Sequence, residues 1–233
     1  MPPEITVASY NIHKGVGRDR RRDLGRTAAV IAEIGADILA LQEVDTRFGT
    51  RKGLLDLDAL QRDLDLVAVP LDQTGPAHGW HGNLLLVRKA LVQQVHKLIL
   101  PGFEPRGAMV TDLQINGQAL RVVNTHLGLL PSSRSAQARA IVAALAQLPE
   151  RPLLLMGDLN EWARDAAMFR TLSSRVSILT PLPSFPARFP LLRYDRIFSC
   201  DRGRLLDLAP HDSALARSAS DHLPMRARLQ LLG

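Results

Sequence analysis

The sequence predicts an α/β protein with a single domain, and three observations lead to this fold class. Short apolar runs lie at residues 38–41, within 82–88 and at 153–156, as is typical of strands buried on both faces. Helical patterns lie between these runs. No linker or short repeat divides the 233 residues, a length at which a domain buries roughly 70–75 % of its unfolded surface. We therefore predict one domain over residues 1–233.

The first half of the chain alternates strand and helix patterns. Residues 5–11 are rich in β-formers, and residues 24–34 place apolar side chains on one helical face before Gly35, a plausible helix stop. The remaining expectations are a strand at 38–41, a surface loop at 46–58, a short helix at 59–66 and a strand within 82–88.

The second half begins with β-structure. Asn116-Gly117 is a strong hairpin signal, which predicts paired strands at 108–115 and 119–124. We expect an edge strand at 91–100, a helix at 132–146 and strands at 153–156, 194–198 and 225–232. The proline-rich residues 180–192 fit no regular element, and a second long loop is expected to run on to 220–224.

The stretch 152–162 has two interpretations. Either a buried strand delivers Asp158 and Asn160 at its end, or Asp158 caps a helix over 162–172 with Glu161 three residues on. On its own the stretch slightly favours the helix cap. Other apolar runs end in the same way, and this recurrence favours the strand.

Composition restricts the partners and the compartment. The formal charge of +6 and the pI of about 10.2 favour polyanionic partners, such as nucleic acid, anionic lipid headgroups or phosphate esters. Aromatic residues are 4 % of the chain, which argues against a surface for stacking single-stranded bases.

The lone Cys200 fits a reducing compartment. With no signal-peptide pattern and no apolar segment of about 20 residues, we expect a cytoplasmic protein without an integral membrane segment. Nothing in the sequence implies an oligomer.

Polar groups of a restricted kind lie at or near one end of the apolar runs. They are Asn, Glu, Asp and His, whereas the abundant Arg and Lys lie elsewhere: Asn11, Glu43, His126, Asp158, Asn160, Asp195, Asp221 and His222. Carboxylate and amide oxygens suit Mg²⁺ or Mn²⁺, and the lack of cysteine ligands argues against a structural zinc site. Histidines beside carboxylates suit acid–base roles near neutral pH. In a basic protein, this combination indicates metal-assisted hydrolysis of a phosphate ester.

The motifs around these residues resemble the endonuclease/exonuclease/phosphatase superfamily, which includes DNase I. They occur in the family's order over nearly the whole chain: Ser9-Tyr10-Asn11, Leu41-Gln42-Glu43-Val44, Asn124-Thr125-His126-Leu127, Gly157-Asp158-Leu159-Asn160, Tyr194-Asp195-Arg196-Ile197 and Ser220-Asp221-His222-Leu223-Pro224. Further stretches, such as His13-Lys14-Gly15 and His81-Gly82-Asn83, are similar to the bacterial YbhP-like subgroup.

This resemblance implies a DNase I-like four-layer α/β sandwich, in which two mixed sheets pack face to face between helices. It implies one or two Mg²⁺ or Mn²⁺ ions, with Glu43 as the main ligand beside Asn11 and Asp221. The other implied roles are a general base, His222, oriented by Asp195; a phosphate or leaving-group contact, His126; and a pair that holds the attacking water and a phosphate oxygen, Asp158 and Asn160.

Three further residues are candidates for binding the substrate phosphate. A guanidinium matches phosphate bidentately, so Arg106 is a candidate clamp, and a surface arginine in a turn is an equal alternative. Lys14 has the same standing, and Asn83 belongs to a matching motif.

The predicted function is hydrolysis of a phosphodiester in nucleic acid or in a phospholipid-like substrate. Apolar side chains in the loop 181–192 favour a lipid and peripheral contact with an anionic membrane, unless that loop only covers core. A phosphomonoesterase acting on a sugar or inositol phosphate stays an alternative. So does a non-catalytic binding module on the same fold. The low Tyr and Trp content makes abasic-site cleavage a poor expectation.

Overall fold

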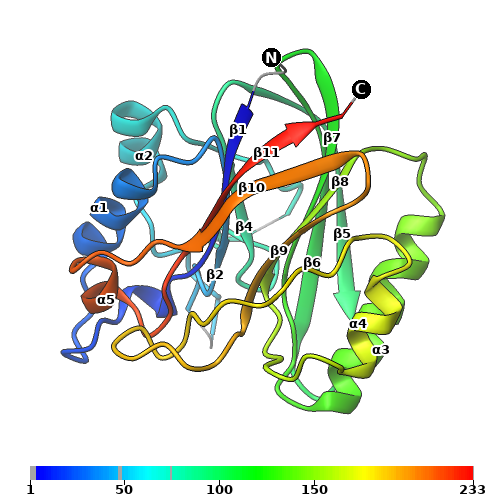
Figure 1. Cartoon of the computed structure of the whole chain (residues 1–233). Helices are drawn as coiled ribbons and strands as arrows, with labels where there is room; N and C mark the ends of the chain where they lie inside the picture. Colours follow the sequence, from blue (N-terminus) through cyan, green and yellow to red (C-terminus); the bar gives the residue numbers. More distant parts are fainter. Residues whose placement is uncertain (1–3, 47–48, 74, 233) are drawn as a thin grey trace.

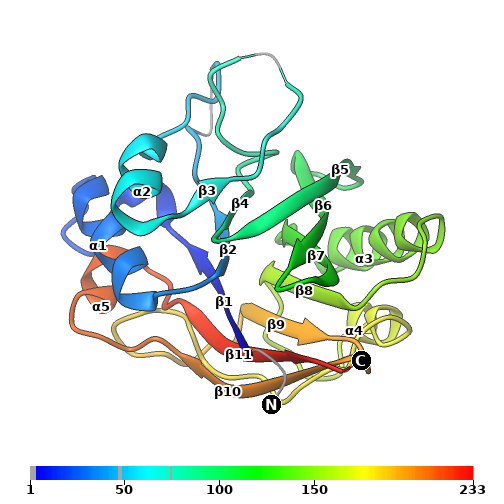
Figure 2. The same cartoon turned by 90° about the horizontal axis from the view of Figure 1, so that it is seen from above.

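Two mixed β-sheets pack face to face, and helices cover both outer faces (Figures 1 and 2). The structure is a computed structural model that describes residues 4–46, 49–73 and 75–232. Part of the N-terminal stretch examined for a signal peptide, residues 1–3, lies outside the described residues. The predicted α/β sandwich of four layers is confirmed.

The first sheet has the strand order β10-β11-β1-β2-β4-β3. Its parallel pair is β1 with β2, and the other neighbours are antiparallel. The strands are β1 (Glu4–Asn11), β2 (Ile38–Gln42), β3 (Val67–Ala68), β4 (Leu84–Val87), β10 (Gly203–Pro210) and β11 (Met225–Leu231).

The second sheet has the order β5-β6-β7-β8-β9, with β7 and β8 parallel. The strands are β5 (Ala90–Leu100), β6 (Arg106–Ile115), β7 (Gln118–His126), β8 (Leu153–Asp158) and β9 (Asp195–Ser199). β5 lies at the edge as predicted, and the hairpin turn is confirmed by positive φ at Asn116 (50°) and Gly117 (77°).

Helices on the first sheet are α1 (Leu24–Ile34), α2 (Leu57–Leu64) and α5 (Ala216–Ala219); α3 (Pro131–Ala146) and α4 (Ala167–Leu172) cover the second (Figure 2). The Asp23 carboxylate accepts a hydrogen bond from the Arg26 backbone N–H (2.9 Å) and so caps α1, which ends at Gly35 in the left-handed conformation. No helix in the described ranges is long and apolar enough to cross a membrane.

The core has three apolar layers. One lies between the two sheets, and the other two lie between each sheet and its helices, so the central strands are covered on both faces. Side chains such as Val7 and Met156 fill the space between the sheets, whereas Ile31 packs between α1 and its sheet. Leu155, one position from Met156 along β8, faces α3 instead. Strands that are apolar on both sides therefore form the unbroken runs seen in the sequence.

Within the stretch 152–162, residues 153–158 form a strand, and the helix-cap interpretation is wrong. β8 runs to Asp158, residues 159–166 are not helical, and α4 starts only at Ala167. Gly157 has a φ of 152°, and a Cβ there would lie 1.8 Å from the Thr125 carbonyl oxygen. Only glycine therefore lets β7 and β8 approach each other at this level.

The expected long loop up to 220–224 is also wrong, because β10 and α5 lie within it. β10 is an edge strand whose side chains are only partly buried, and its pairing with β11 shifts between Leu206 and Ala209. Asp207 in this irregularity has a φ of 52°. The bulge breaks the period of two by which a strand is recognised.

The ends of the central strands meet at one edge, which is the lower edge in Figure 1. His126 pairs with Asp158 across β7 and β8, and Asp158 pairs with Asp195 across β8 and β9. In the other sheet, Asn11 at the end of β1 pairs with Gln42 at the end of β2. The start of β1 and the end of β11 lie at the opposite edge (Figure 1). The topology alone thus gathers most of the candidate residues.

Candidate active site

The Asp158 carboxylate is the centre of the candidate site. Its Oδ2 accepts a hydrogen bond from Asn11 Nδ2 (2.9 Å) and lies 3.4 Å from His126 Nε2 and 3.7 Å from His222 Nε2. Asn11 comes from the first sheet and Asp158 from the second, so this contact joins the sheets at the edge where their strands end. All four side chains are buried.

The second oxygen of Asp158 orders the turn that follows β8. Asp158 Oδ1 accepts from the Asn160 backbone N–H (2.9 Å), and Asn160 Nδ2 donates to the Leu127 carbonyl (2.9 Å). Asn160 has a φ of 51°, in the left-handed region. These contacts hold Asn160 beside the loop that follows His126.

His222 and Asp195 form a buried imidazole–carboxylate pair. His222 Nδ1 lies 2.8 Å from Asp195 Oδ2, which also accepts a hydrogen bond from Ser184 Oγ at 2.5 Å. Burial opposes the imidazolium, but the Asp195 and Asp158 carboxylates outweigh burial and raise the pKa of His222 to about 10. The ring is also packed against Phe185, with centroids 4.8 Å apart. Its tautomer and orientation are thereby restricted.

His126 has the opposite titration behaviour. Burial disfavours its charged form and lowers its pKa to about 4, in spite of the nearby Asp158. The pKa of Asp158 is lowered although burial alone would raise it, because His126 and His222 favour the carboxylate. At neutral pH the site therefore holds a neutral imidazole, His126, and a protonated one, His222, around one carboxylate.

Glu43 follows β2 and has a strained backbone, with a φ of 58°. Its carboxylate is paired with Lys14 Nζ, and Lys14 (φ 56°) and His13 (φ 47°) are left-handed as well. Burial raises the pKa of Glu43, but His126 and Lys14 outweigh it, so that the net shift is downward. Left-handed non-glycine residues cost free energy, and their concentration here indicates a functional constraint.

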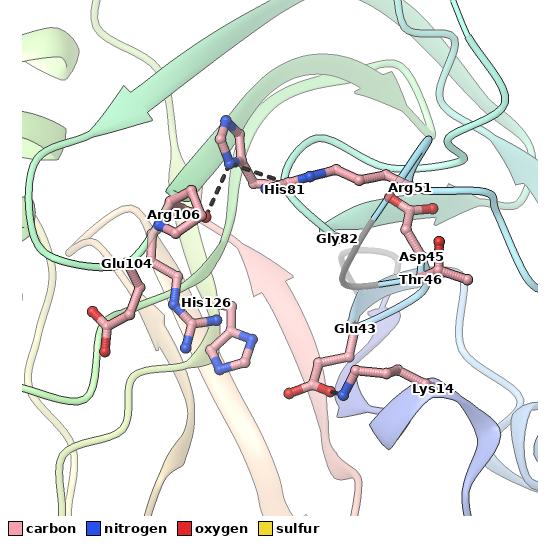
Figure 3. A pocket seen from close by; sticks show the side chains of 12 residues that line it. Lys14, Glu43, Asp45, Thr46, Arg51, His81, Gly82, Glu104, Arg106 and His126 are labelled. Carbon is pink, nitrogen blue, oxygen red and sulfur yellow. Dashed lines mark hydrogen bonds and ion pairs between the residues drawn. The ribbon is translucent and has the colours of Figure 1, made fainter.

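A pocket of about 410 Å³ opens beside this centre (Figure 3). It is lined by Lys14, Glu43, Asp45, Thr46, Gly49, Arg51, His81, Gly82, Glu104, Pro105, Arg106 and His126. Figure 3 shows the Arg106 guanidinium beside the His126 ring and Lys14 against Glu43. The pocket thus places cationic side chains next to the histidine and carboxylates of the centre.

The oxygen donors of the site fit a hard divalent cation. The ligand atoms of Asp158, Asp195 and His222 lie within 4.8 Å of one another. However, the Asp195 and His222 atoms are hydrogen-bonded to each other, which suits proton transfer better than metal binding. Glu43 and the amide oxygen of Asn11 are the donor types that Mg²⁺ prefers. We therefore favour the Glu43 end of the site for the ion.

Asp221, the third predicted metal ligand, lies beside the short 3-10 helix η1 (His13–Gly15). Its Oδ1 is 3.5 Å from His13 Nδ1, and its side chain is 39 % exposed. Its neighbour Ser220 donates from Oγ to the Asn11 carbonyl (2.8 Å), which ties the His222 segment to the end of β1. The segment 220–222 is thus fixed against Asn11.

Asn83 does not line the pocket. Its side chain is buried, and Nδ2 donates to the Trp80 carbonyl (2.9 Å) and the Gly107 carbonyl (3.1 Å). To reach a phosphate it would have to leave both carbonyls. Its predicted phosphate contact stays a prediction that these contacts do not favour. Arg106 and Lys14 do line the pocket.

Three residues near the site were not predicted from the sequence. Ser184 and Phe185 belong to the proline-rich loop and contact Asp195 and His222. Arg51 lies in a loop that was expected only at the surface, and its Nη1 is 3.4 Å from His81 Nδ1. No local pattern marks these contacts. The proline content of residues 180–192 was the one signal that the loop is ordered.

A model of the endonuclease/exonuclease/phosphatase family matches residues 8–222, and the chain belongs to this family. Its similarity to the YbhP-like subgroup is confirmed by the uncharacterised protein YbhP of Escherichia coli strain K12. That protein is 29 % identical, over 97 % of this chain and 96 % of YbhP. Members of the family are generally hydrolases that act on phosphoester bonds.

Solved structures share the fold. An endonuclease/exonuclease/phosphatase from Bacteroides vulgatus is similar, with a TM-score of 0.76, 19 % identity and coverage of 98 % of this chain and 99 % of that one. D. rerio TDP2, solved in complex with a single-strand DNA product, has a TM-score of 0.71 and 16 % identity, with coverage of 97 % and 99 %. At these identities the likeness concerns the fold alone.

Proposed function

We propose that this protein hydrolyses a phosphodiester with the help of one or two divalent cations, Mg²⁺ or Mn²⁺. The observation that carries the proposal is the buried His222–Asp195 pair, which faces Asp158 at the edge of a pocket that contains Glu43 and Arg106. Glu43, Asn11 and Asp221 would hold the ion. When bound, the ion neutralises charge on the phosphate and stabilises the leaving oxygen.

The residues of the chain divide the proton transfers between them. His222, held at Nδ1 by Asp195, presents Nε2 toward Asp158 and is the general base of this proposal. Its pKa of about 10 leaves it protonated at neutral pH, so it must release its own Nε2 proton before it accepts that of the attacking water. The two carboxylates stabilise the imidazolium that forms. Asp158 and Asn160 orient the water and one phosphate oxygen. His126, neutral because it is buried, contacts the phosphate or assists the leaving group.

Arg106 and Lys14 bind the substrate phosphate in this proposal. Arg106 lines the pocket near His126, where a guanidinium can bind two phosphate oxygens. Lys14 is paired with Glu43 and lies at the same wall of the pocket. The loss of either cation should therefore weaken binding of the substrate more than it slows the chemical step.

The substrate class is nucleic acid or a phospholipid-like ester. The net charge of +6 accommodates both. A cytoplasmic location stays a prediction from the lone cysteine. Two alternatives stay open: a phosphomonoesterase on a sugar or inositol phosphate, and a non-catalytic anion-binding or nucleic-acid-binding module.

The test is hydrolysis of bis-p-nitrophenyl phosphate with Mg²⁺ or Mn²⁺. We expect Glu43→Gln and His222→Ala to lower kcat by about 100-fold or more. His211→Ala is the matched control, because His211 contacts Glu33 on the surface and belongs to none of the site contacts. Equal rates in all four proteins would favour the binding module. Faster turnover of p-nitrophenyl phosphate than of the diester would favour the phosphomonoesterase.

A further inference from the structure

Large apolar side chains are exposed on the loops that surround the candidate active site. Three loops carry them: residues 101–105 between β5 and β6, 127–130 after β7, and the long connection 159–194 between β8 and β9. The exposed side chains are Phe103 (87 %), Leu129 (60 %), Leu130 (43 %), Trp162 (55 %), Phe189 (63 %) and Leu191 (70 %). We call this set the apolar rim. Large exposed apolar groups that gather in one region of a surface indicate an interaction site.

The strand pairings place these loops at one edge of the molecule. Leu100 pairs with Arg106 at the end of the β5–β6 hairpin, Ala108 pairs with Thr125, and His126 pairs with Asp158. All of the rim loops therefore leave the sheet at the edge that holds His126 and Asp158, which is the lower edge in Figure 1.

Direct contacts connect the rim to the site. The Leu129 backbone N–H donates to Glu104 Oε1 (3.1 Å), and Glu104 lines the pocket next to Phe103. On the other side, the Leu191 backbone N–H donates to the Phe185 carbonyl (2.9 Å), and the Phe185 ring packs against His222. The rim is thus held on both sides of the catalytic centre.

Basic residues lie among the apolar ones. Arg164 and Arg188 are exposed and Arg193 is partly exposed, and all three belong to the long connection that carries Trp162, Phe189 and Leu191. The Arg188 guanidinium lies 5.1 Å from the centre of the Phe189 ring. Aromatic and leucine side chains beside arginines are the combination that binds the interface of an anionic membrane, where apolar groups insert and arginines contact headgroup phosphates.

We propose that the apolar rim docks the protein on an anionic lipid bilayer and so presents the pocket to headgroup phosphodiesters. The rim loops contact residues of the site, Glu104 and Phe185. Insertion of the rim side chains would therefore turn the pocket toward the membrane. The part that concerns the substrate rests on the proposed function. Docking itself does not, and it is measured without catalysis.

The first experiment is co-sedimentation with vesicles of phosphatidylcholine and phosphatidylglycerol, in EDTA. The rim variant is Phe103→Ser, Phe189→Ser and Leu191→Ser. The matched control is Val67→Ser and Leu91→Ser, two exposed positions (44 % and 61 %) on β3 and β5 away from the rim loops. We expect the rim variant to bind about tenfold or more weakly, since burial of each apolar side chain is lost, and the control to bind like the native chain. Equal binding of both variants, or no vesicle binding by the native chain, would overturn the proposal.

A second measurement does not depend on the folding of the rim variant. Trp162 lies in the rim, so its fluorescence should shift to the blue and be quenched by brominated lipid when vesicles are added. Trp162→Phe should remove that change, since Trp80 packs near Lys97 within the fold. An unchanged spectrum in the native chain contradicts docking through the rim.

Two further measurements, hydrolysis of a soluble substrate and binding of single-stranded DNA, distinguish failure of the docking proposal from failure of the proposed function. The rim variant should hydrolyse soluble bis-p-nitrophenyl phosphate like the native chain, because none of its substitutions lies in the catalytic centre. If the native chain binds vesicles but does not hydrolyse bis-p-nitrophenyl phosphate with Mg²⁺ or Mn²⁺, the proposed function is wrong and docking still stands. Loss of single-stranded DNA binding in the rim variant, with vesicle binding unchanged, would assign the rim to nucleic acid and overturn the lipid proposal.

Discussion

Asp158 lies between two histidines whose pKa values shift in opposite directions. Both imidazoles are buried, and burial lowers the pKa of each. Asp195 contacts His222 Nδ1 at 2.8 Å and is the carboxylate that raises the pKa of His222 most, whereas Arg106 lowers the pKa of His126 further. The hydrogen-bonded Asp195 carboxylate is therefore the main reason that His222 holds a proton at neutral pH while His126 is neutral.

The role of Asp195 predicts the effect of Asp195→Asn. The amide keeps the shape but neither stabilises the imidazolium nor selects the same tautomer, so we expect kcat on bis-p-nitrophenyl phosphate to fall about 100- to 10,000-fold. The pKa of His222 should fall at the same time. NMR titration of the His222 ring measures that change independently of turnover.

Ser184→Ala is the matched control for Asp195→Asn. It removes the hydroxyl that donates to Asp195 Oδ2 but leaves the carboxylate and its contact with His222. We expect less than a tenfold loss of kcat. If Ser184→Ala is as damaging as Asp195→Asn, positioning by the loop, and not the charge of Asp195, controls His222.

His126 predicts how stability depends on pH. Its pKa is lowered from 6.5 in the unfolded chain to about 4 in the folded protein. The unfolded chain therefore takes up the proton first as the pH falls. The contribution of neutral His126 to the free energy of unfolding is therefore fully present above pH 6.5. It is lost as the pH drops toward 4, by roughly 3 kcal/mol in total.

Urea denaturation between pH 7 and pH 5 measures this effect. His126→Gln, which cannot titrate, should lose less stability over that interval than the native chain. His211→Gln is the control, because His211 is at the surface beside Glu33. An identical pH dependence in native chain and His126→Gln would show that His126 is not held neutral by the fold.

The sequence could identify most of the residues that meet at the site, because each lies at or near the end of a strand in a motif of the family. Asn11, Asp158, Asn160, Asp195 and His222 are joined by hydrogen bonds or close contacts, whereas their chemical roles stay predictions. Ser184 and Arg51 could not be identified, since irregular loops bring them to the site. The contacts of Asn83 with two carbonyls likewise depend on how separate loops meet.

At the scale of elements, Gly157 determines how closely β7 and β8 lie together. Gly157→Ala would place a Cβ 1.8 Å from the Thr125 carbonyl oxygen, at a φ of 152° that L-residues rarely adopt. The strands must separate at the level of His126 and Asp158. We expect a loss of several kcal/mol in the free energy of unfolding, together with a loss of activity.

Gly117→Ala is the matched control for Gly157→Ala. Gly117 has a φ of 77°, but no heavy atom lies within 4 Å of a Cβ built there. Only the backbone cost of about 1 kcal/mol should appear, with activity unchanged. Thermal denaturation of both variants separates strain from collision. Equal losses of stability would contradict a collision at Gly157.

Strands with long apolar runs were predictable, and elements without a clean period were not. β8 and β4 are buried on both faces and read as apolar runs, and the caps of α1 mark its ends. β10 pairs at an edge through a bulge, so neither burial nor alternation identifies it. At 152–162 only the recurrence of the pattern along the chain favoured the strand over the helix cap, because the tight packing of Gly157 is a property of the folded sheet.

At the scale of the whole molecule, the two sheets are joined by polar contacts as well as by the apolar core. Asn124 on β7 is fully buried, and its Oδ1 accepts from Gln42 Nε2 (3.0 Å). Its Nδ2 donates to the Leu41 carbonyl (3.2 Å) and the Leu84 carbonyl (2.9 Å). These three contacts cross from the second sheet to the first. They fix one sheet against the other just behind the candidate site.

The relative position of the sheets was predictable only through the family resemblance. Local patterns identify strands but not which sheet a strand joins, because strand order depends on contacts between distant segments. Asn124 belongs to a motif of the family, yet nothing in the sequence assigns its side chain to Gln42 of the other sheet. The bridge between them is therefore a finding of the structure.

Asn124→Leu should destabilise the fold and disturb the site together. It leaves the Leu41 and Leu84 carbonyls without their buried side-chain donor, and each such loss costs about 1–3 kcal/mol. It also removes one of the acceptors of Gln42 Nε2, which keeps Ser9 Oγ and the Ala40 carbonyl. We expect a loss of about 3 kcal/mol or more in the free energy of unfolding and lower turnover in the fraction that stays folded, because Asn11 and Asp158 face each other across the same interface. Urea denaturation of Asn124→Leu, Gln42→Leu and the double variant should give a coupling of about 1 kcal/mol or more between the two positions.

Thr111→Val is the control for Asn124→Leu. Thr111 is as deeply buried, but its hydroxyl has no hydrogen-bond partner among the described residues, so this substitution should be neutral or stabilising. Additive effects of Asn124→Leu and Gln42→Leu would contradict a stabilising hydrogen bond between these two side chains across the sheets.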